Sequence, residues 1–386
     1  MRVCFLAHSI QWDSGGGATF EDSVLQALSK IDIGHDCYFM CLDGNYNDHY
    51  TLRQISWNRK KSWINRIFPK AICMNKVLIE EYNIDFVWAI TPSAIRSGLK
   101  LPYALTVWDL SHRGVAVFPE FMTSGWPYTD RERHYQEFLM QASVVITGNE
   151  VGKREIQRFY TIPDQRIKVI PFSVPPFVFE SYPTIDVNKQ WNIQHPFLFY
   201  PAQFWPHKNH MCILKALKKL LDSGHFFSVV FCGADKGNLS YIKQCAKSLG
   251  VDEYVQFLGF VSRAELVSLY QQAFAMVYAS YLGPNNLPPL ESMALQCPVI
   301  CSNIAGMQEQ LSDAALFFDP NSDDQLVDAV VSLMNGASVR QTCIENGNRL
   351  VASLSIESYV KRIKDVLDEI EPMRSCWSNQ QVWNHL

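Results

Sequence analysis

The sequence predicts an α/β protein of two domains, each built around a doubly wound parallel sheet. The chain has 386 residues, of which 48% are hydrophobic. This length is too great for one ordinary core and sufficient for two. Short apolar runs alternate with helical stretches twice over, as they do in parallel sheets whose two faces are covered by helices. A proline-rich run at 171–183, which we expect to be a linker rather than a helix, separates the two series.

The first series predicts a domain over residues 1–178. Short runs rich in β-branched and aromatic residues are its expected strands. These are Val3–Ala7, Cys37–Cys41, Phe86–Ala89, Tyr103–Val107 and Val144–Thr147. A glycine cluster, SGGG at 14–17, follows the first strand, and Thr19 is placed to cap the helix that comes next.

The second series predicts a domain over residues 179–355, followed by a C-terminal helix and tail at 356–386. The expected strands are Phe197–Pro201, Ser228–Cys232, Val255–Leu258, Ala275–Ala279, Val299–Cys301 and Leu316–Phe318. Helices are expected between and after them, among them His210–Asp222, Ala264–Gln272 and Asp324–Met334. The amphipathic stretch Glu357–Glu371 is predicted to be a helix that packs back on the N-terminal domain.

Composition narrows the class of protein. The net charge of −4 lacks the basic excess of a nucleic-acid binder. The 11 cysteines are odd in number and lie mostly in apolar runs, which is typical of buried side chains in a reducing compartment rather than of disulfides. The first residues predict a strand rather than a signal peptide, and no apolar run reaches the roughly 20 residues of a membrane helix. We therefore expect a cytoplasmic protein, at most peripheral on the inner face of the membrane.

The stretch Tyr278–Glu291, YASYLGPNNLPPLE, is the first candidate site. A strand is expected to end near Ala279 and a helix to begin at Pro288, with a tight loop between them. The start of such a helix offers N–H groups and a positive dipole end to an anion. Glu291, expected in the first turn, suits a ribose diol. The alternative is a plain strand-to-helix turn with a helix-stabilising glutamate.

The stretch Tyr200–His210, YPAQFWPHKNH, follows the first strand of the second series. Ligands of doubly wound sheets bind at the carboxyl ends of the strands, where Lys208 could reach a diphosphate. A solvated surface lysine is the alternative. His207 and His210 have no third ligand at metal spacing, so surface histidines at a helix start are expected there.

Two motifs of the first domain are weaker candidates. Gly16 and Gly17 would let backbone approach a phosphate or sugar, although the cluster is not a GxGxxG fingerprint and a flexible turn explains it equally well. In Val107–His112, VWDLSH, the polar side chains of Asp109 and His112 are expected at the same cleft rim, where either could hold an acceptor hydroxyl. The alternative is that Asp109 caps the next turn and His112 is partly buried.

Together these motifs resemble the retaining GT-B glycosyltransferases of family 4. The match rests on LPPLE at 287–291 and the stretch SMALQCPVICSNIAGMQEQLSDAALFFDP that follows, with KVIPFSVP at 168–175 and LGFVSRAEL at 258–266 as further landmarks. It spans nearly the whole chain and is clearest from about 195 to 320. The resemblance implies two Rossmann-like domains facing a central cleft. It also implies transfer of a sugar from a nucleotide sugar, UDP- or GDP-linked, to a glycan or lipid-linked saccharide in polysaccharide or O-antigen-type assembly, without a cofactor.

The resemblance also implies roles for individual residues. Lys208 would contact the donor diphosphate, Glu291 the nucleotide ribose, and the backbone of Asn285–Leu287 the donor sugar and phosphates. Gly16 or Gly17 would close over the diphosphate, and Gly259–Val261 would flank the nucleobase. The candidate catalytic residues are Lys208, Asp109 and His112. The candidate donor-binding residues are Gly16, Gly17, Gln203, Lys208, Val261, Asn285, Asn286, Leu287 and Glu291.

The chain departs from the family pattern at three positions. Gly283 stands where the first glutamate of the motif is expected, Gln203 where a basic residue often precedes the lysine, and Trp108–Asp109 where a His-Asp pair is common. Lys208 would then balance more of the diphosphate charge, together with loop amides and the helix dipole. The chain contains no Asp-x-Asp, and we expect no metal site. The resemblance further implies retention by same-face attack, with the leaving phosphate oxygen taking the acceptor proton.

The acceptor side is less specified. Residues 57–76, WNRKKSWINRIFPKAICMNK, carry basic residues and two tryptophans without an acid, and could rest on an anionic membrane. A solvated helix with buried tryptophans is the alternative. Rival functions are a catalytically silent sugar-nucleotide-binding partner subunit, which Gly283 and Gln203 favour, or a nucleotide-sugar epimerase or phosphorylase. A nicotinamide dehydrogenase is disfavoured by the incomplete glycine fingerprint.

Overall fold

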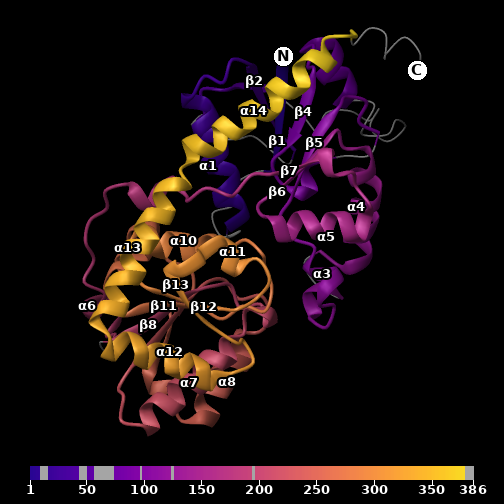
Figure 1. Ribbon diagram of the computed structural model, residues 1–386. Coiled ribbons are helices and arrows are strands. Elements are labelled where there is room, and N and C mark those ends of the chain that lie inside the picture. The colour runs from indigo at the N-terminus through magenta and orange to yellow at the C-terminus, as the bar shows by residue number, and fades with distance from the viewer. Residues whose placement is uncertain are drawn as a thin grey trace, which may run out of the picture. The chain divides into compact units, whose positions relative to one another are not determined.

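The computed structural model describes residues 1–8, 16–42, 50–55, 74–95, 98–122, 126–193 and 196–378. The chain forms two compact units, coloured mainly indigo to magenta and magenta to orange in Figure 1. Unit 1 consists of Met1–Leu110, Tyr128–Ser173 and Ile356–Leu386, and unit 2 of Ser111–Pro127 and Val174–Ser355. Each unit is therefore assembled from segments that are distant in the sequence.

A seven-stranded sheet forms the centre of unit 1, in the order β3-β2-β1-β4-β5-β6-β7. All described pairs are parallel, and the order reverses direction between β1 and β4, as in a doubly wound fold. The inner strands are buried apolar runs because helices cover both faces. The strands are β1 (Arg2–Ala7), β2 (Asp36–Cys41), β3 (Arg53–Ile55), β4 (Phe86–Ala89), β5 (Tyr103–Val107), β6 (Val144–Thr147) and β7 (Ile167–Val169).

The longer helices of unit 1 are α1 (Gly16–Lys30), α4 (Tyr128–Gln141), α5 (Glu150–Tyr160) and α14 (Ile356–Arg374). A π-helical segment, Lys76–Glu81, precedes β4. The expectation that Thr19 caps the first helix is wrong, because α1 already begins at Gly16 and Thr19 lies inside it. The glycines themselves start the helix, which leaves Thr19 no terminal N–H group to accept from.

The C-terminal helix α14 packs lengthwise on unit 1 (Figure 1). Its apolar face, which includes Val360, Ile363 and Leu367, is buried. Phe20 of α1 contacts Tyr359 of α14 edge-on at 5.3 Å between ring centroids and also packs against Phe172 at 4.9 Å. Burial of this apolar stripe is the main term that holds the helix to the unit.

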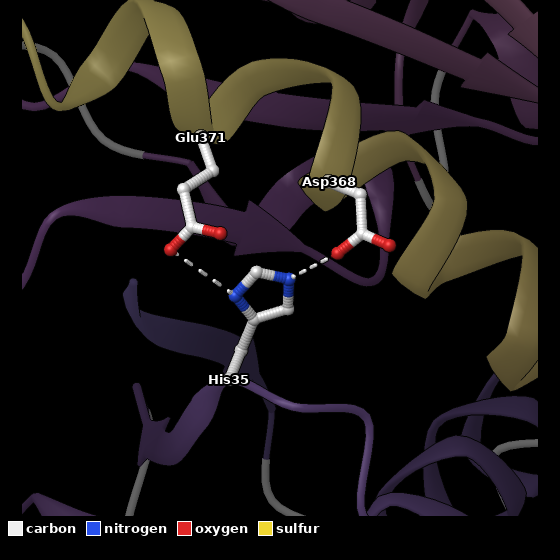
Figure 2. A group of neighbouring side chains, drawn as sticks. All are labelled: His35, Asp368 and Glu371. Atoms are coloured by element: carbon white, nitrogen blue, oxygen red, sulfur yellow. Dashed lines mark hydrogen bonds and ion pairs between the residues drawn. The ribbon is translucent and has the colours of Figure 1, made fainter.

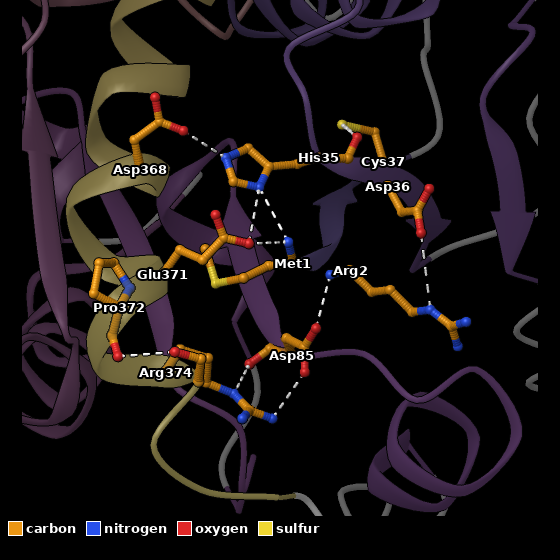
Figure 3. Close-up of polar contacts among 11 residues, drawn as sticks. Met1, Arg2, His35, Asp36, Cys37, Asp85, Asp368, Glu371, Pro372 and Arg374 are labelled. Carbon is orange, nitrogen blue, oxygen red and sulfur yellow. Dashed lines mark hydrogen bonds and ion pairs between the residues drawn. The ribbon is translucent and has the colours of Figure 1, made fainter.

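Polar contacts along the rim of α14 set its position. The imidazole of His35 lies between Asp368 and Glu371, one turn apart on the helix, as Figure 2 shows. Its Nε2 hydrogen-bonds the Asp368 carboxylate at 3.0 Å. Farther along, the guanidinium of Arg374 is buried and pairs with Asp85 at 3.0 Å, while its Nε donates to the Asp85 carbonyl (Figure 3). Burial lowers the pKa of Arg374, and Asp85 opposes this effect.

Unit 2 contains a six-stranded parallel sheet in the order β10-β9-β8-β11-β12-β13. The order reverses between β8 and β11, so this unit is doubly wound as well. The strands are β8 (Phe197–Pro201), β9 (Ser228–Cys232), β10 (Val255–Phe257), β11 (Ala275–Tyr278), β12 (Val299–Ser302) and β13 (Ala315–Phe318).

Helices cover both faces of this sheet. Figure 1 shows α10 and α11 on one side and α7, α8 and α12 on the other. The helices of the unit are α3 (Ser111–Gly114), α6 (Val187–Trp191), α7 (His210–Asp222), α8 (Leu239–Leu249), α9 (Arg263–Gln272), α10 (Leu287–Ala294), α11 (Met307–Leu311), α12 (Asp323–Asn335) and α13 (Ala337–Ser353). A capping box of Ser262 and Glu265 begins α9. The run at 171–183 holds one 3-10 turn, Pro176–Phe179, between irregular stretches.

These observations confirm the predicted α/β class with two Rossmann-like parallel sheets. The short edge strands β3 (RQI) and β7 (IKV) were not predicted, since a charged residue in each leaves no continuous apolar run. The described cysteines form no disulfide with one another, and most are buried. Within the described ranges, no helix is both long and apolar enough to cross a membrane. A central cleft between the units depends on their relative placement and stays a prediction.

Candidate functional site

The candidate donor residues of unit 2 gather where its strands end. Gly233, just after β9, has a φ of +147°, and a Cβ there would lie 2.4 Å from the carbonyl oxygen of Ala202. Its N–H donates to the Gly259 carbonyl at 2.7 Å. The loops after β8, β9 and β10, which carry Gln203 and Val261, are thereby held side by side. This is the carboxyl edge of the sheet, where doubly wound folds bind ligands.

Lys208 ends a 3-10 turn, Pro206–Lys208, at this edge. Asn209 follows in the left-handed conformation, with φ of 54°, and turns the chain into α7. The Lys208 backbone is fixed, because its carbonyl accepts from the Tyr200 hydroxyl at 2.9 Å and its N–H donates to Trp205 at 3.0 Å. Its ammonium donates to the Tyr278 hydroxyl at 2.9 Å and pairs with no carboxylate of a described residue. Because its side-chain partner among the described residues is neutral, this half-buried cation leaves a positive charge available to an anion.

Tyr278, the last residue of β11, connects Lys208 to the GPNN loop. Its hydroxyl accepts from Lys208 and donates to Oδ1 of Asn286. The Asn286 amide nitrogen donates to the Gly283 carbonyl at 2.6 Å. Gln310 of α11 holds the Asn286 backbone from both sides, accepting from its N–H and donating to its carbonyl, each at 2.9 Å. The loop is therefore a closed hydrogen-bond network, consistent with pre-organisation for a ligand.

Gly283 has a structural reason to be glycine. Its φ is +107°, a left-handed backbone that disfavours any side chain. A Cβ at this position would lie 2.7 Å from Oδ1 of Asn286 and 3.0 Å from its Nδ2. The space that a glutamate would enter is thus occupied by the Asn286 amide.

The remaining loop residues include one unsatisfied donor. The Nδ2 atom of Asn285 is buried and has no hydrogen-bond partner among the described residues. Buried polar groups nearly always have partners, so an orphaned donor at a strand end indicates a place for a ligand atom or water. Leu287 begins α10 and is buried, and prolines fill the next two positions of the helix.

Glu291 lies in the second turn of α10, so the expectation of the first turn is wrong by one residue. It is 7% exposed, and the buried hydroxyl of Tyr270 donates to its Oε2 at 2.9 Å. Burial raises the pKa of Glu291 to about 7, and the Tyr270 hydrogen bond acts against that rise. A buried carboxylate with a raised pKa at a strand-end site is typical of functional positions. The structure leaves its ribose role a prediction.

The two histidines differ from the expectation of surface side chains. His210 is fully buried, stacks on Phe204 at 4.5 Å between ring centroids, and is kept neutral because burial, together with Lys208, lowers its pKa to about 3. His207 is only partly exposed, and its Nδ1 forms a short contact with the Glu120 carboxylate. The expectation that both histidines lie on the surface is wrong, because the first residues of α7 and the turn before it pack into the interior of unit 2.

Glu120 belongs to a segment, residues 111–127, that precedes most of unit 2 in sequence and yet packs within it. We call this segment the strap. Phe118 of the strap lies 6.1 Å from the His207 ring and 5.8 Å from Tyr281, while the Tyr281 N–H donates to the His207 carbonyl at 2.9 Å. The strap is therefore anchored on both loops that carry the candidate donor residues.

The candidates of unit 1 are placed as follows. Gly16 and Gly17 form the first turn of α1, and a Cβ on Gly17 would lie 2.5 Å from the Trp108 indole, so close packing also requires this glycine. Asp109 is half-buried and pairs with Arg131 at 3.7 Å. His112 is buried in α3, which belongs to unit 2. A shared rim for Asp109 and His112 would span both units and stays a prediction.

One group among the described side chains has metal-ligating chemistry, namely His35, Asp368 and Glu371. Its ligand atoms are already engaged. Asp368 accepts from the imidazole, and the Met1 ammonium lies 2.6 Å from Glu371 and 3.2 Å from Nδ1 of His35 (Figure 3). His35 already contacts both carboxylates of the helix, so we assign the group to the docking of α14.

The sequence assigned no role to Gln310 or Glu120, and it included Tyr278 only as the first residue of a candidate stretch. Tyr278 belongs to an apolar strand and Gln310 to a short polar helix, so neither position carries a signal of its own. Glu120 is more than 80 residues from His207 in sequence, so only the fold brings them together. The basic segment 57–76, apart from Met74–Lys76, lies outside the described residues.

A comparison with protein-family models found a match within the second unit. Residues 182–350 match the model of one protein family. That family is the glycosyl transferases group 1. The matched range contains Lys208, Tyr278 and the whole GPNN loop, so the network described above lies inside it.

Among curated proteins, the chain is similar to the O-antigen chain mannosyltransferase RfbU of Salmonella typhimurium, at 30% identity over 54% of this chain and 57% of that protein. It is also similar to the O-antigen chain mannosyltransferase B of Escherichia coli, at 25% identity over 56% and 58% of the two chains. The chain thus spans less than two thirds of the length of these curated relatives.

Among solved structures, the complex of HepE from Anabaena with UDP and glucose superposes with a TM-score of 0.75 at 16% identity, covering 96% of this chain and 100% of that one. At this identity the likeness concerns the fold, which is the two-unit GT-B architecture of glycosyltransferases.

Proposed function

We propose that this protein is a glycosyltransferase that moves a sugar from a nucleotide-sugar donor to a glycan or lipid-linked saccharide, with retention of anomeric configuration and without a metal ion. The observation that carries the proposal is the arrangement at the carboxyl edge of the unit 2 sheet, within the range of the family match. There the Lys208 ammonium, which pairs with no carboxylate of the described residues, lies beside a loop in which the buried Asn285 Nδ2 has no partner in the same part of the chain.

In this proposal the leaving diphosphate is stabilised by Lys208 and by the positive end of α10. Glu291 accepts from the ribose hydroxyls with the oxygen that Tyr270 leaves free. The departing phosphate oxygen takes the proton of the acceptor hydroxyl, so no protein base is required. Two relatives are named O-antigen chain mannosyltransferases, which supports a role in O-antigen-type glycan assembly and a mannose nucleotide as a donor to test.

A thermal-shift screen tests the donor class, because a ligand that binds only the folded state raises the melting temperature. We expect stabilisation by UDP or GDP and their sugars, including GDP-mannose and UDP-glucose, and none by NAD. A shift with NAD alone would contradict the proposal. The Lys208→Met variant serves as the control that should lose the diphosphate-dependent part of the shift.

The chemistry requires separate measurements. Proton NMR of the product should show the anomeric configuration of the donor, and an inverted product would contradict retention. Activity should persist in a chelator, and loss that a divalent metal restores would contradict metal independence.

A catalytically silent partner subunit is the second candidate, which the glycine at 283 in place of a carboxylate favours. Sugar transfer by the purified chain alone would exclude it. Donor binding without any transfer, restored by adding a second glycosyltransferase, would support it.

A further inference from the structure

We propose that Tyr278 and Asn286 are positioning residues, which hold the Lys208 ammonium at the donor diphosphate through a neutral hydrogen-bond relay. This inference rests on the proposed function, because it concerns how the same site presents its cation. Neither side chain carries a charge, because the relay consists of the Tyr278 phenol and the Asn286 amide.

The direction of the relay follows from the donors available. An ammonium can only donate, so the Tyr278 oxygen accepts from Lys208 at 2.9 Å. The single phenolic hydrogen is then directed at the Asn286 Oδ1. The Asn286 amide nitrogen donates onward to the Gly283 carbonyl at 2.6 Å and points at the Met307 sulfur at 3.1 Å. Each group therefore has one consistent role.

The relay is anchored at both ends by rigid elements. Tyr278 is 1% exposed at the end of β11, and its ring packs edge-on against Tyr200 at 5.8 Å between centroids. Asn286 is clamped by Gln310 through two backbone hydrogen bonds. The Tyr278 hydroxyl therefore cannot swing away, and it restricts the flexible lysine side chain to one direction.

The neutrality of the relay matters for the anion. A carboxylate beside Lys208 would neutralise its charge and repel a diphosphate, whereas a phenol orients the ammonium and leaves its charge uncompensated. The left-handed backbone at Gly283 and the Asn286 amide that fills the space beside it keep a side chain out of this position. This chain therefore has glycine at position 283 instead of the expected glutamate, and a tyrosine hydroxyl that orients the Lys208 ammonium.

The first test observes Lys208 directly and does not depend on any nucleotide. Reductive ¹³C-methylation of lysines gives one NMR signal per side chain, and the signal that Lys208→Arg lacks identifies this residue. We expect Tyr278→Phe to shift and narrow the Lys208 signal, because the ammonium loses its partner and gains mobility. Tyr281→Phe is the matched control, since its hydroxyl contacts Asn321 rather than Lys208. An unchanged Lys208 signal in Tyr278→Phe would overturn the positioning role.

The second test measures its consequence for binding. Calorimetry with UDP and GDP, compared with uridine and guanosine, separates the contribution of the diphosphate to binding from that of the nucleoside. Hydrogen bonds to charged groups contribute more than about 1.4 kcal/mol, so Tyr278→Phe should weaken diphosphate binding roughly tenfold and leave nucleoside binding unchanged. Asn286→Asp, which places a negative charge in the relay, should weaken diphosphate binding at least as much as Tyr278→Phe does.

The outcomes are distinguishable. Equal weakening of nucleotide and nucleoside, with a lowered melting temperature, would mean that Tyr278 only supports the fold and would overturn the inference. A shifted Lys208 signal without any nucleotide binding by the parent chain would keep the relay and overturn the proposed donor class. Additive losses in Lys208→Met and Tyr278→Phe would also contradict a relay, since residues acting through one another are non-additive.

Discussion

At the scale of single residues, the site contains a carboxylate whose burial opposes stability. Glu291 is buried in unit 2 with one side-chain hydrogen bond from a described residue, and burial raises its pKa. Gly283, in the same stretch LGPNNLPPLE, has a left-handed backbone that a glycine adopts without strain and another residue would not. Groups whose burial lowers the stability of the folded state are common at functional sites.

The charge of Glu291 should cost stability at neutral and alkaline pH. Its folded-state pKa is raised to about 7, so between pH 4.5 and 7 the native state binds more protons than the unfolded one and stability falls as pH rises. Glu291→Gln keeps an acceptor for Tyr270 and removes this loss, which we place at up to about 3 kcal/mol above pH 7. Urea unfolding at pH 5 and pH 8 measures it.

The variant should gain stability at pH 8 and little at pH 5, and it should lose transfer activity. Glu253→Gln, an exposed carboxylate of the same unit, is the control and should behave alike at both pH values. Equal gains at pH 5 and pH 8 would show that the Glu291 carboxylate is not strained by burial.

Gly283→Ala should be destabilising beyond the cost of its backbone alone. Gly237 has a similar φ, +96° against +107°, but a Cβ there meets nothing within 4 Å. Gly237→Ala should therefore lower the free energy of unfolding by roughly 1 kcal/mol, which is the cost of the backbone conformation alone. Gly283→Ala should lower it by about 1 kcal/mol more than Gly237→Ala does, because Asn286 must also shift. Thermal unfolding of both variants measures the difference. Equal losses would indicate that Asn286 yields without cost.

At the scale of elements, most boundaries follow from local patterns. Strands such as Phe197–Pro201 and the helix His210–Asp222 were predicted to the residue, because continuous apolar runs and a 3.6-residue period are strong signals. The strap at 111–127 was not recognised, since short helical turns carry no periodicity. Its Phe118 and Glu120 meet unit 2 only through contacts distant in sequence.

The contact between Glu120 and His207 should hold the strap in place. Burial acts to raise the pKa of Glu120, but the hydrogen bond and charge of His207 outweigh it and lower that pKa below its ordinary value. Stability from this contact is therefore present above the unfolded pKa and lost as pH falls through the folded one. Glu120→Gln should increase hydrogen exchange at Phe121 and Met122 at pH 7, as measured by mass spectrometry.

Glu253→Gln again serves as the comparison and should leave exchange in the strap unchanged. Unchanged exchange in Glu120→Gln would show that the ring contacts of Phe118 alone hold the strap. Should Glu120→Gln lose as much stability on acidification as the parent, another carboxylate must account for the acid sensitivity.

At the scale of the whole molecule, each compact unit is closed by a segment from elsewhere in the chain. Unit 1 includes α14, more than 180 residues beyond its preceding segment, and unit 2 includes the strap. Unit 1 should therefore depend on α14 for its stability, although all seven strands of its sheet precede this helix in the sequence.

Ile363→Ala tests this dependence. Ile363 is fully buried in the face of α14 that packs on unit 1, and removing three buried carbons typically costs about 2–4 kcal/mol. Calorimetry should show a lower melting temperature for the transition of unit 1. Lys361→Ala, on the exposed side of the same helix, should change it little. An unchanged transition in Ile363→Ala would mean that α14 adds nothing to the unit.

The amino-acid sequence by itself determined the α/β class, nearly every strand of both sheets and the stretches that carry the candidate site. These follow from local physical chemistry, since apolar runs, proline and glycine act over a few residues. Only the tertiary structure decided which side chains meet. It placed Tyr278 between Lys208 and Asn286, gave Gly283 its left-handed backbone, and brought Glu120 to His207. Such contacts join residues 8 to 87 positions apart, and no short-range pattern records them.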